Sequence, residues 1–578
     1  MASPATRPRR GQRFDAEHPR YKWVALSNTT LGVLIGTINA SIVIISLPAI
    51  FRGIRLDPLA PGNVSYLLWM IMGFLVVSAV LVVTLGRLGD IYGRVRVYNL
   101  GFAVFAAASV FLSVDPLHGS AGALWLILGR VVQGVGGAML FANSAAILTD
   151  AFPSSQRGTA LGINQVAAIA GSFLGLVIGG LLSEWDWRAV FWVSVPIGIV
   201  GAVWSYKSLH ELGERRAAKL DLPGNVTFGV GLTALLVAIT YGIQPYGGHP
   251  TGWTNPWVLA GLVGGALLLV LFCVVETRVA EPMFSMSLFR LRPFSMGNLA
   301  GLLAAVGRGG MQFMLIIWLQ GIWLPLHGYD YASTPLWAGI YLLPLTIGFL
   351  VAGPVSGWLS DRVGARSLST LGMLVVTATF LGFLYLPVDF TYWAFAALLA
   401  VFGVGSGLFS APNTTAIMNS VPAHQRGAAS GMGGTVLNAG MALSIGVFFS
   451  LMIAGLASTL PRTLFHGLTA QGVAAPVATQ VAHLPPVGSL FAAFLGYNPI
   501  QSLLQPTGAL SSLSARHRAT LTGKEFFPHL MSAPFHHGLV IVFIAAAAMT
   551  FVGALASLLR GDKYVHVEQP VTQAEVAA

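Results

Sequence analysis

The feature that most constrains this chain is a series of long apolar stretches separated by short polar segments. Each is roughly 18 residues or longer, close to the length that an α-helix needs to cross a bilayer. Backbone groups in hydrocarbon find no water to bond, so each stretch must be helical. The sequence therefore predicts an all-α integral membrane protein. Its fourteen predicted spans are residues 23–50, 64–86, 96–113, 122–149, 158–182, 189–206, 225–243, 257–275, 295–323, 335–358, 367–387, 391–419, 427–455 and 537–560.

The scarcity of charge excludes a soluble protein. Only 9% of the 578 residues are charged, whereas soluble domains carry about 25%. The single cysteine, Cys273, excludes a disulfide framework and a cysteine-based metal cluster. We expect no metal site and no cofactor.

Lysine and arginine alternate along the chain in a way that predicts its orientation. With the N-terminus inside, 22 of the 31 basic residues fall in inner segments and 7 in outer ones, while Arg130 and Arg308 fall inside spans. Inner loops of membrane proteins carry this excess. We expect a plasma-membrane protein with both termini cytoplasmic. Its net charge of +11 fits anionic lipid headgroups better than nucleic acid.

An internal repeat divides the chain. Gly-x₃-Asp-x₂-Gly occurs at residues 86–93 and again 271 residues later, at 357–364. Pro-x₂-Gln-Arg-Gly begins at Pro153 and at Pro422, an offset of 269. Parallel repeats about an axis along the membrane normal are typical of transporters.

We expect two six-helix halves separated by two inserted helices. The predicted segments are a cytoplasmic tail at 1–22, an N-terminal half at 23–207, two inserted spans with linkers at 208–294, a C-terminal half at 295–560 and a cytoplasmic tail at 561–578. The C-terminal half includes residues 456–536, too long for a simple turn. We expect these residues to form a partly helical extracellular lid.

Several motifs resemble signatures of the major facilitator superfamily. They are the loop at 86–96 with its degenerate copy at 357–366, residues 128–136 in the fourth span and residues 187–198 at the sixth. Fourteen spans with two central extras resemble its drug:proton antiporter family. The resemblance implies secondary active transport by alternating access, with efflux of amphipathic organic compounds or drugs. It also implies a small-molecule substrate, protons as coupling ion and a monomer in the bilayer.

The loop motif supplies a candidate gate. Its glycines allow a tight turn, and Asp90 can accept hydrogen bonds from Arg94 or Arg96. In the resembling family such a cluster latches the two halves on the cytoplasmic side. The predicted gating residues are Gly86, Asp90, Gly93, Arg94, Arg96, Asp361 and Arg362.

The fifth span carries a glycine face. Gly171, Gly175 and Gly179 lie on one side of a helix and allow another helix to approach closely. The family's antiporter motif has a proline after the position of Gly175, where this chain has Leu176. For this glycine face we therefore keep two interpretations, tight helix packing and a role in gating.

Polar residues inside the spans are the candidates for a substrate and coupling cavity, because such residues are costly in a membrane. They are Asn39, Arg130, Asn164, Gln165, Arg308, Gln312 and Asn438. No Asp or Glu falls mid-span. Many members of the resembling family carry an Asp where this chain has Asn39, which leaves the site of proton coupling open.

Three functions remain for comparison. The first is an exporter of amphipathic compounds. The second is an exporter of an anionic metabolite or lipid, motivated by the two arginines inside spans. The third is a membrane sensor that transports nothing. A phosphate-binding loop and a nucleophile–base triad are both missing from the sequence, so we do not expect an enzyme.

Overall fold

The computed structural model describes residues 18–57, 60, 62–153, 156–212, 221–279, 282, 284–422, 425–496 and 498–561. In this described part, fourteen helices are long and apolar enough to cross a membrane. Each overlaps one predicted span, which confirms the all-α membrane fold expected from the apolar stretches.

The first half contains six spans. Its helices are α1 (Tyr21–Gly53), α2 (Asn63–Tyr92), α3 (Arg94–Ser113), α4 (Gly119–Ala151), α5 (Arg157–Trp185), α6 (Ala189–Trp192) and α7 (Ser194–Ser208). The short helix α6 and α7 together form the sixth span. Two further spans follow, α8 (Leu222–Gly242) and α9 (Pro256–Glu276). A 3₁₀ turn, η1 (Met286–Arg290), leads into the second half.

The second half also contains six spans. Its helices are α10 (Arg292–Trp318), the π-helical turn η2 (Leu319–Trp323), α11 (Leu324–Leu326), α12 (Thr334–Tyr341), α13 (Leu343–Val363), α14 (Ala365–Leu384), α15 (Tyr392–Asn419), α16 (Arg426–Ala470) and α22 (Phe526–Leu558). Here α10, η2 and α11 form one span, and α12 and α13 form another.

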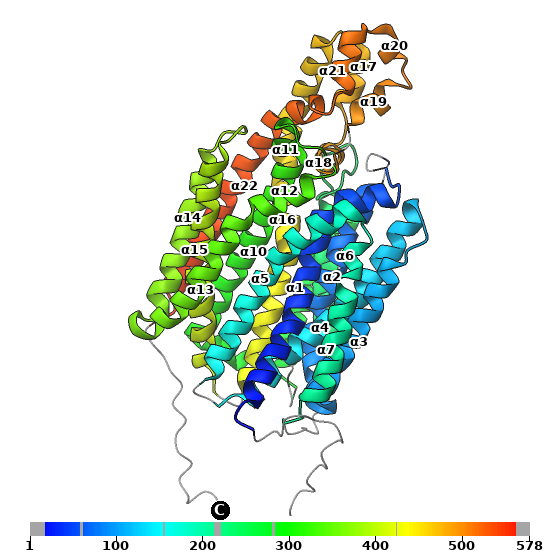
Figure 1. Cartoon of the computed structure of the whole chain (residues 1–578). Coiled ribbons are helices and arrows are strands. Elements are labelled where there is room, and N and C mark those ends of the chain that lie inside the picture. Colours follow the sequence, from blue (N-terminus) through cyan, green and yellow to red (C-terminus); the bar gives the residue numbers. More distant parts are fainter. Residues whose placement is uncertain are drawn as a thin grey trace, which may run out of the picture.

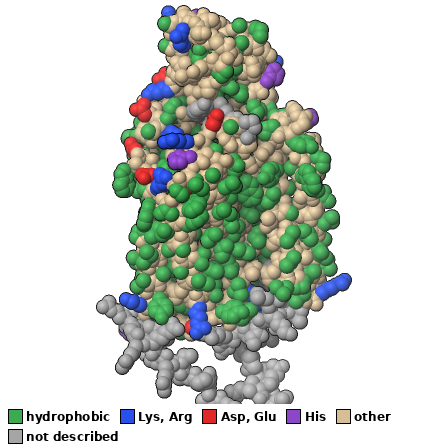
Figure 2. Space-filling view, turned by 90° about the vertical axis from the view of Figure 1, so that its right-hand side faces the viewer, with side chains coloured by type: hydrophobic (Ala, Val, Ile, Leu, Met, Phe, Trp, Pro, Cys, Tyr) green, Lys and Arg blue, Asp and Glu red, His purple; other side chains and the backbone are tan. Residues whose placement is uncertain are grey.

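The two ends of the bundle differ (Figure 1). We call the end where α1 begins and α22 ends the terminal end. The opposite end carries the cap, which consists of α17 (Ala475–Ala482), α19 (Pro499–Leu504), α20 (Ala509–Ser512) and α21 (Ala515–Thr522). Figure 2 shows hydrophobic side chains covering the middle of one face, with Lys and Arg at both ends of that belt. A band of this kind matches the hydrocarbon core of a bilayer.

The internal repeat is visible in backbone and packing. Gly93 (φ 111°) joins α2 to α3, and Gly364 (φ 93°) joins α13 to α14. Residues that carry a side chain rarely adopt such positive φ angles, which explains why both copies of the repeat have glycine at this position. A Cβ on Gly136 would lie 3.0 Å from the Gly101 carbonyl oxygen. In the second half, the same distance separates a Cβ on Gly405 from the Gly372 oxygen.

The inserted pair lies against the seam between the halves. Helix α8 packs on α2 of the first half and on α16 of the second. Thr84 of α2 and Asn225 of α8 are hydrogen-bonded, and Gly446 of α16 faces Ile239. Helix α9 packs on α8 and leaves large apolar side chains such as Trp257 and Leu267 exposed, as expected for a lipid-facing helix.

The segment predicted as a lid is more helical and more buried than expected. Helix α16 continues to Ala470 and α22 already begins at Phe526, so both extend beyond their predicted spans. Between them α18 (Pro486–Phe494) is buried along its whole length and packs on α10, η2, α16 and α22 of the second half and on α2 of the first. The Phe491 ring stacks on Phe449 of α16 with centroids 5.2 Å apart.

Candidate functional site: a cavity between the two halves

A cavity of about 250 Å³ lies between the two halves. Its walls come from α1, α2, α4 and α5 of the first half and from α10, α14, α15 and α16 of the second. Leu161, Asn298, Met418 and Ser430 line it, and each lies within two turns of the terminal end of its helix. The cavity therefore occupies the half of the bundle towards the terminal end.

The cap end above the cavity is closed by backbone contacts between the halves. A Cβ on Gly180 of α5 would lie 2.5 Å from the Leu336 Cα of α12, and one on Gly339 would lie 2.9 Å from the Leu176 carbonyl oxygen. The Gln320 side chain donates a hydrogen bond of 3.1 Å to the Ile45 carbonyl oxygen of α1. Small residues at these positions allow the backbones of the two halves to touch.

The wall of the cavity is amphipathic. Its aromatic residues are Phe74, Phe141, Phe402 and Phe409. Amide and hydroxyl side chains add polar groups, and Arg308 adds a positive charge. No Asp, Glu, Lys or His is among the described residues that line it. Such a surface suits an organic molecule with an apolar body and a few polar atoms.

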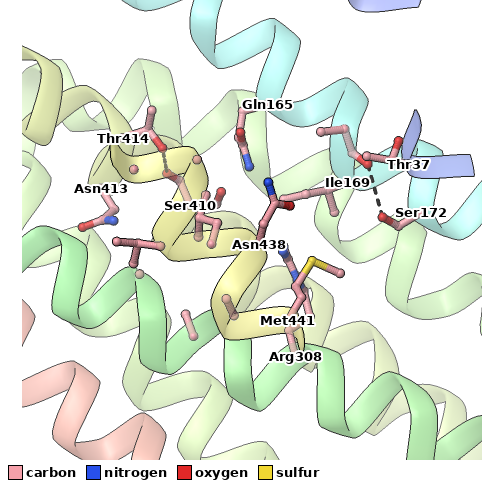
Figure 3. A pocket seen from close by; sticks show the side chains of 18 of the residues that line it. Thr37, Gln165, Ile169, Ser172, Arg308, Ser410, Asn413, Thr414, Asn438 and Met441 are labelled. Atoms are coloured by element: carbon pink, nitrogen blue, oxygen red, sulfur yellow. Dashed lines mark hydrogen bonds between the residues drawn. The ribbon is translucent and has the colours of Figure 1, made fainter. Parts of the chain in front are cut away.

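Four of the seven predicted cavity residues line the cavity, namely Asn164, Gln165, Arg308 and Asn438. Asn164 is held within the first half, because its amide donates a 2.9 Å hydrogen bond to Ser144 Oγ. Figure 3 shows the other three side chains near the centre of the cavity: Arg308 beside Asn438, and Gln165 on the facing wall.

Two of the predicted residues, Asn39 and Arg130, lie outside the cavity wall, in the interior of the first half. The Arg130 guanidinium donates to the Met70 carbonyl oxygen (3.2 Å), to Gln133 Oε1 (2.7 Å) and to Asn39 Oδ1. The Asn39 amide donates in turn to Ser194 Oγ at 3.2 Å. Arg130 lies 4.6 Å from the centre of the Phe74 ring, which also lines the cavity. This ring therefore separates the Arg130 charge from the cavity.

The seventh predicted residue, Gln312, lies one turn from Arg308 on α10, but not in the cavity wall. It is buried, and its Nε2 has no hydrogen-bond partner among the described residues.

Sequence reasoning missed Asn413 and Arg560. Asn413 lines the cavity, donates a 3.1 Å hydrogen bond to the Gly297 carbonyl oxygen and accepts one from Arg560. Arg560, just beyond α22, is 3% exposed, although its position after an apolar span is typical of an interfacial cation. The polar run Asn413-Thr414-Thr415 inside a span was the available signal.

The loop cluster is assembled within the first half. Arg94 Nε lies 2.8 Å from Asp90 Oδ1, and Arg94 Nη1 lies 2.6 Å from Asp150 Oδ1 at the end of α4. The carboxylate of Glu211 accepts a hydrogen bond from the Val95 backbone N–H. Asn143 Oδ1 faces Gly89, where a side chain would collide with it. Apart from Glu211, which follows α7, these groups belong to the first half, and none of these contacts joins the two halves at the terminal end.

The remaining predicted gating residues contribute less to this cluster. Gly86 faces Ala142 of α4, and Gly93 makes the turn into α3. Arg96 is exposed and makes no ion pair with a described residue. Arg362 lies over the Trp358 ring at 4.1 Å. The side chain of Asp361 lies outside the described residues.

The glycine face of α5 packs on α1. A Cβ on Gly175 would lie 2.5 Å from the Ile38 carbonyl oxygen, and one on Gly179 would lie 2.9 Å from that of Ile42. Gly171 faces Leu34 and Thr37 of the same helix. These glycines join two helices of one half. Gly180, the next residue along, makes the contact with the other half.

Comparisons with known proteins agree with this architecture. The sequence profile of the Major Facilitator Superfamily matches residues 29–445. The tetracenomycin C resistance and export protein of Streptomyces glaucescens is 27% identical over 93% of this chain and 91% of its own length. The riboflavin transporter RibZ of Clostridioides difficile is 27% identical over 76% of this chain and 90% of its own. The multidrug resistance protein Stp of Mycobacterium tuberculosis (strain CDC 1551 / Oshkosh) is 30% identical, covering 76% and 78%.

Solved structures show the same fold. A bacterial homologue of the human lysosomal transporter Spinster, crystallised inward-facing and unoccupied, aligns with a TM-score of 0.52 at 15% identity, covering 94% of this chain and 99% of its own. The human organic anion transporter MFSD10 aligns with a TM-score of 0.51 at 13% identity, covering 83% and 99%. The profile match spans most of the fourteen-helix bundle, and the chain belongs to the Major Facilitator Superfamily of membrane transporters.

Proposed function

We propose that this transporter exports amphipathic organic compounds across the plasma membrane by alternating access. The observation that carries the proposal is a cavity between two pseudo-repeated halves, which lies towards one end of the bundle while the backbones of the halves touch at the other end. A substrate site between repeats suits a mechanism in which the halves rock about it. Relatives named for tetracenomycin C export and for multidrug resistance support efflux.

The terminal end faces the cytoplasm in this proposal. The excess of Lys and Arg in the segments at that end supports the assignment, since basic residues concentrate in cytoplasmic loops. The structure then corresponds to an inward-facing state that takes substrate from the cytoplasm or the inner leaflet, and the cap lies outside.

Protons are the proposed coupling ion, but none of the described residues that line the cavity is a carboxylate that could carry one. Arg130 is held by the Asn39 amide and by neutral oxygens. An amide does not titrate, so coupling at this place would require another group.

Transport of N-phenyl-1-naphthylamine, a neutral amphiphile, by purified protein in liposomes tests the proposal. Ser410 lines the cavity, and Ser410→Trp fills it, so transport should stop. Ser511 is exposed on the cap, and Ser511→Trp is the matched control, which should transport like the wild type. Absence of transport by the wild type, for this neutral probe and for an anionic amphiphile alike, would favour the sensor hypothesis. Full transport by Ser410→Trp would show that substrate does not use this cavity.

A further inference from the structure

We infer that Arg308, Asn438 and Gln165 form a binding site for the anionic group of an organic substrate. The inference rests on the proposed export function and names its substrate class: amphiphiles that carry a carboxylate, sulfonate or phosphate.

The three side chains share one property. Each lines the cavity, and none of them hydrogen-bonds to a described residue. The amide N–H groups of the other three asparagines in the same wall, Asn164, Asn298 and Asn413, donate to protein oxygens. The Asn298 amide, for example, donates to the Phe294 carbonyl oxygen at 2.9 Å, and the Asn413 amide donates to that of Gly297. The hydrogen-bonding capacity of the trio is therefore available to a ligand.

The charge of Arg308 is the strongest of these features. Arg130 and Arg560, which are both buried, donate to protein oxygens. Arg308 is half-buried in the middle of a span and forms no ion pair with a described residue. An uncompensated charge at this depth is costly, and such residues pair with another group or mark a substrate path. In a wall whose described residues include no carboxylate, an anionic ligand supplies the missing partner.

The geometry also gives the ligand an orientation. A guanidinium binds carboxylate, sulfonate or phosphate oxygens through parallel N–H groups, and the Asn438 amide beside it adds a donor (Figure 3). The phenylalanines of the wall accept the apolar body. Gln165 approaches from the first half, whereas Arg308 and Asn438 belong to the second. A bound anion therefore links the two halves, which favours closure of the terminal end.

A matched pair of probes tests the charge preference. 8-Anilinonaphthalene-1-sulfonate carries a sulfonate, and N-phenyl-1-naphthylamine has the same aromatic body without it. Binding to the full-length protein is measured by fluorescence in phosphatidylcholine nanodiscs, with empty discs subtracted. The variants are Arg308→Gln, which removes the charge, and Arg308→Lys, which keeps it. Arg292→Gln, exposed at the start of the same helix, is the control.

We expect Arg308→Gln to weaken sulfonate binding about 10- to 100-fold, the range for a lost hydrogen bond to a charged group. Binding of the neutral probe should change less than about twofold. Arg308→Lys should retain part of the affinity, and Arg292→Gln all of it. Equal losses for both probes would show a packing role and overturn the inference, as would unchanged sulfonate binding.

Two further arms complete the test. If phosphatidylglycerol in the discs competes with the sulfonate probe, the anion recognised includes a lipid headgroup, and if it does not, the ligand is a free organic anion. Liposome transport of both probes distinguishes this inference from the proposed function. If the neutral probe is transported and the anion is not preferred, the proposed export function holds but the inferred anion site is wrong. Transport of neither probe contradicts the proposed function itself.

Discussion

The substitution Gly180→Ala should shift the protein towards a state that is open at the cap end. In this structure the added Cβ would lie 2.5 Å from the Leu336 Cα and 2.6 Å from the Pro335 carbonyl oxygen, and both of these are backbone atoms. Ordinary contacts at a Cβ begin at 3.4 Å, so α12 would have to retreat by the difference, 0.9 Å. Neither contacting atom belongs to a flexible side chain that could turn away.

Overpacking of this kind costs about 1–3 kcal/mol. The cost applies only while α5 and α12 are in contact, which is when the cap end is closed. It therefore raises the free energy of this state relative to a state that is open at the cap end. At about 1.4 kcal/mol per tenfold, the population ratio should change by about 5- to 150-fold. Gly339→Ala, with its nearest atom at 2.9 Å, should act in the same direction but less strongly.

The assay is labelling of a cavity cysteine from the cap side. Ser410→Cys in a Cys273→Ala background reports access to the cavity, with an impermeant thiol reagent added to intact cells. Gly180→Ala should raise the labelling rate about fivefold or more, in line with the population shift. Gly264→Ala on α9 is the control, because a Cβ there meets no atom of the described residues within 4 Å. Equal labelling of the two variants would refute the assignment of the seal to the α5–α12 contact.

Three other predictions concern orientation, the loop cluster and coupling. In intact cells, the cysteine of Ser511→Cys on the cap should react with an impermeant thiol reagent, whereas that of Leu212→Cys, exposed at the terminal end, should not. The reverse pattern would show that the protein has the opposite orientation in the membrane. Asp90→Asn removes one of the two carboxylates that pair with Arg94. It should lower the free energy of unfolding by less than about 1 kcal/mol, whereas transport should fall severely. Unchanged transport would show that the cluster serves only as the positive charge that sets the orientation of the protein. Asn39→Asp places a titratable group beside Arg130 and should make neutral-probe transport depend more steeply on an imposed proton gradient; because Asn39 does not line the cavity, the preference between the two probes should stay the same.

The fold could be predicted from the sequence because the length and apolarity of a run of residues decide whether it crosses a bilayer. A run of apolar residues of sufficient length must be a helix that crosses the membrane, so the fourteen spans and the repeat at residues 86 and 357 can be predicted. Helices that continue into water obey no such rule. The sequence after residue 455 contains polar residues and Pro461, yet α16 continues through them to Ala470.

The site follows less completely, because a polar residue in a span reveals its depth but not its neighbours. Arg130 and Arg308 are both arginines inside apolar spans, and sequence alone placed both in the cavity. The structure distinguishes them. Arg130 donates hydrogen bonds to oxygens of Met70 and Gln133, whereas Arg308 lines the cavity. Arg560 illustrates the opposite error, since a cation after an apolar span is expected at the membrane surface, whereas this one is buried against Asn413.

The most direct test of alternating access about this cavity is a pair of distance measurements by pulsed electron paramagnetic resonance on the full-length protein in nanodiscs. Spin labels at the exposed positions Tyr92 and Val363 span the halves at the terminal end, and labels at Trp185 and Trp393 span them at the cap end. On addition of 8-anilinonaphthalene-1-sulfonate, the terminal-end distance should shorten and the cap-end distance should lengthen. If both distance distributions stay the same while the ligand is bound, the halves do not rock about the cavity, and the account is contradicted.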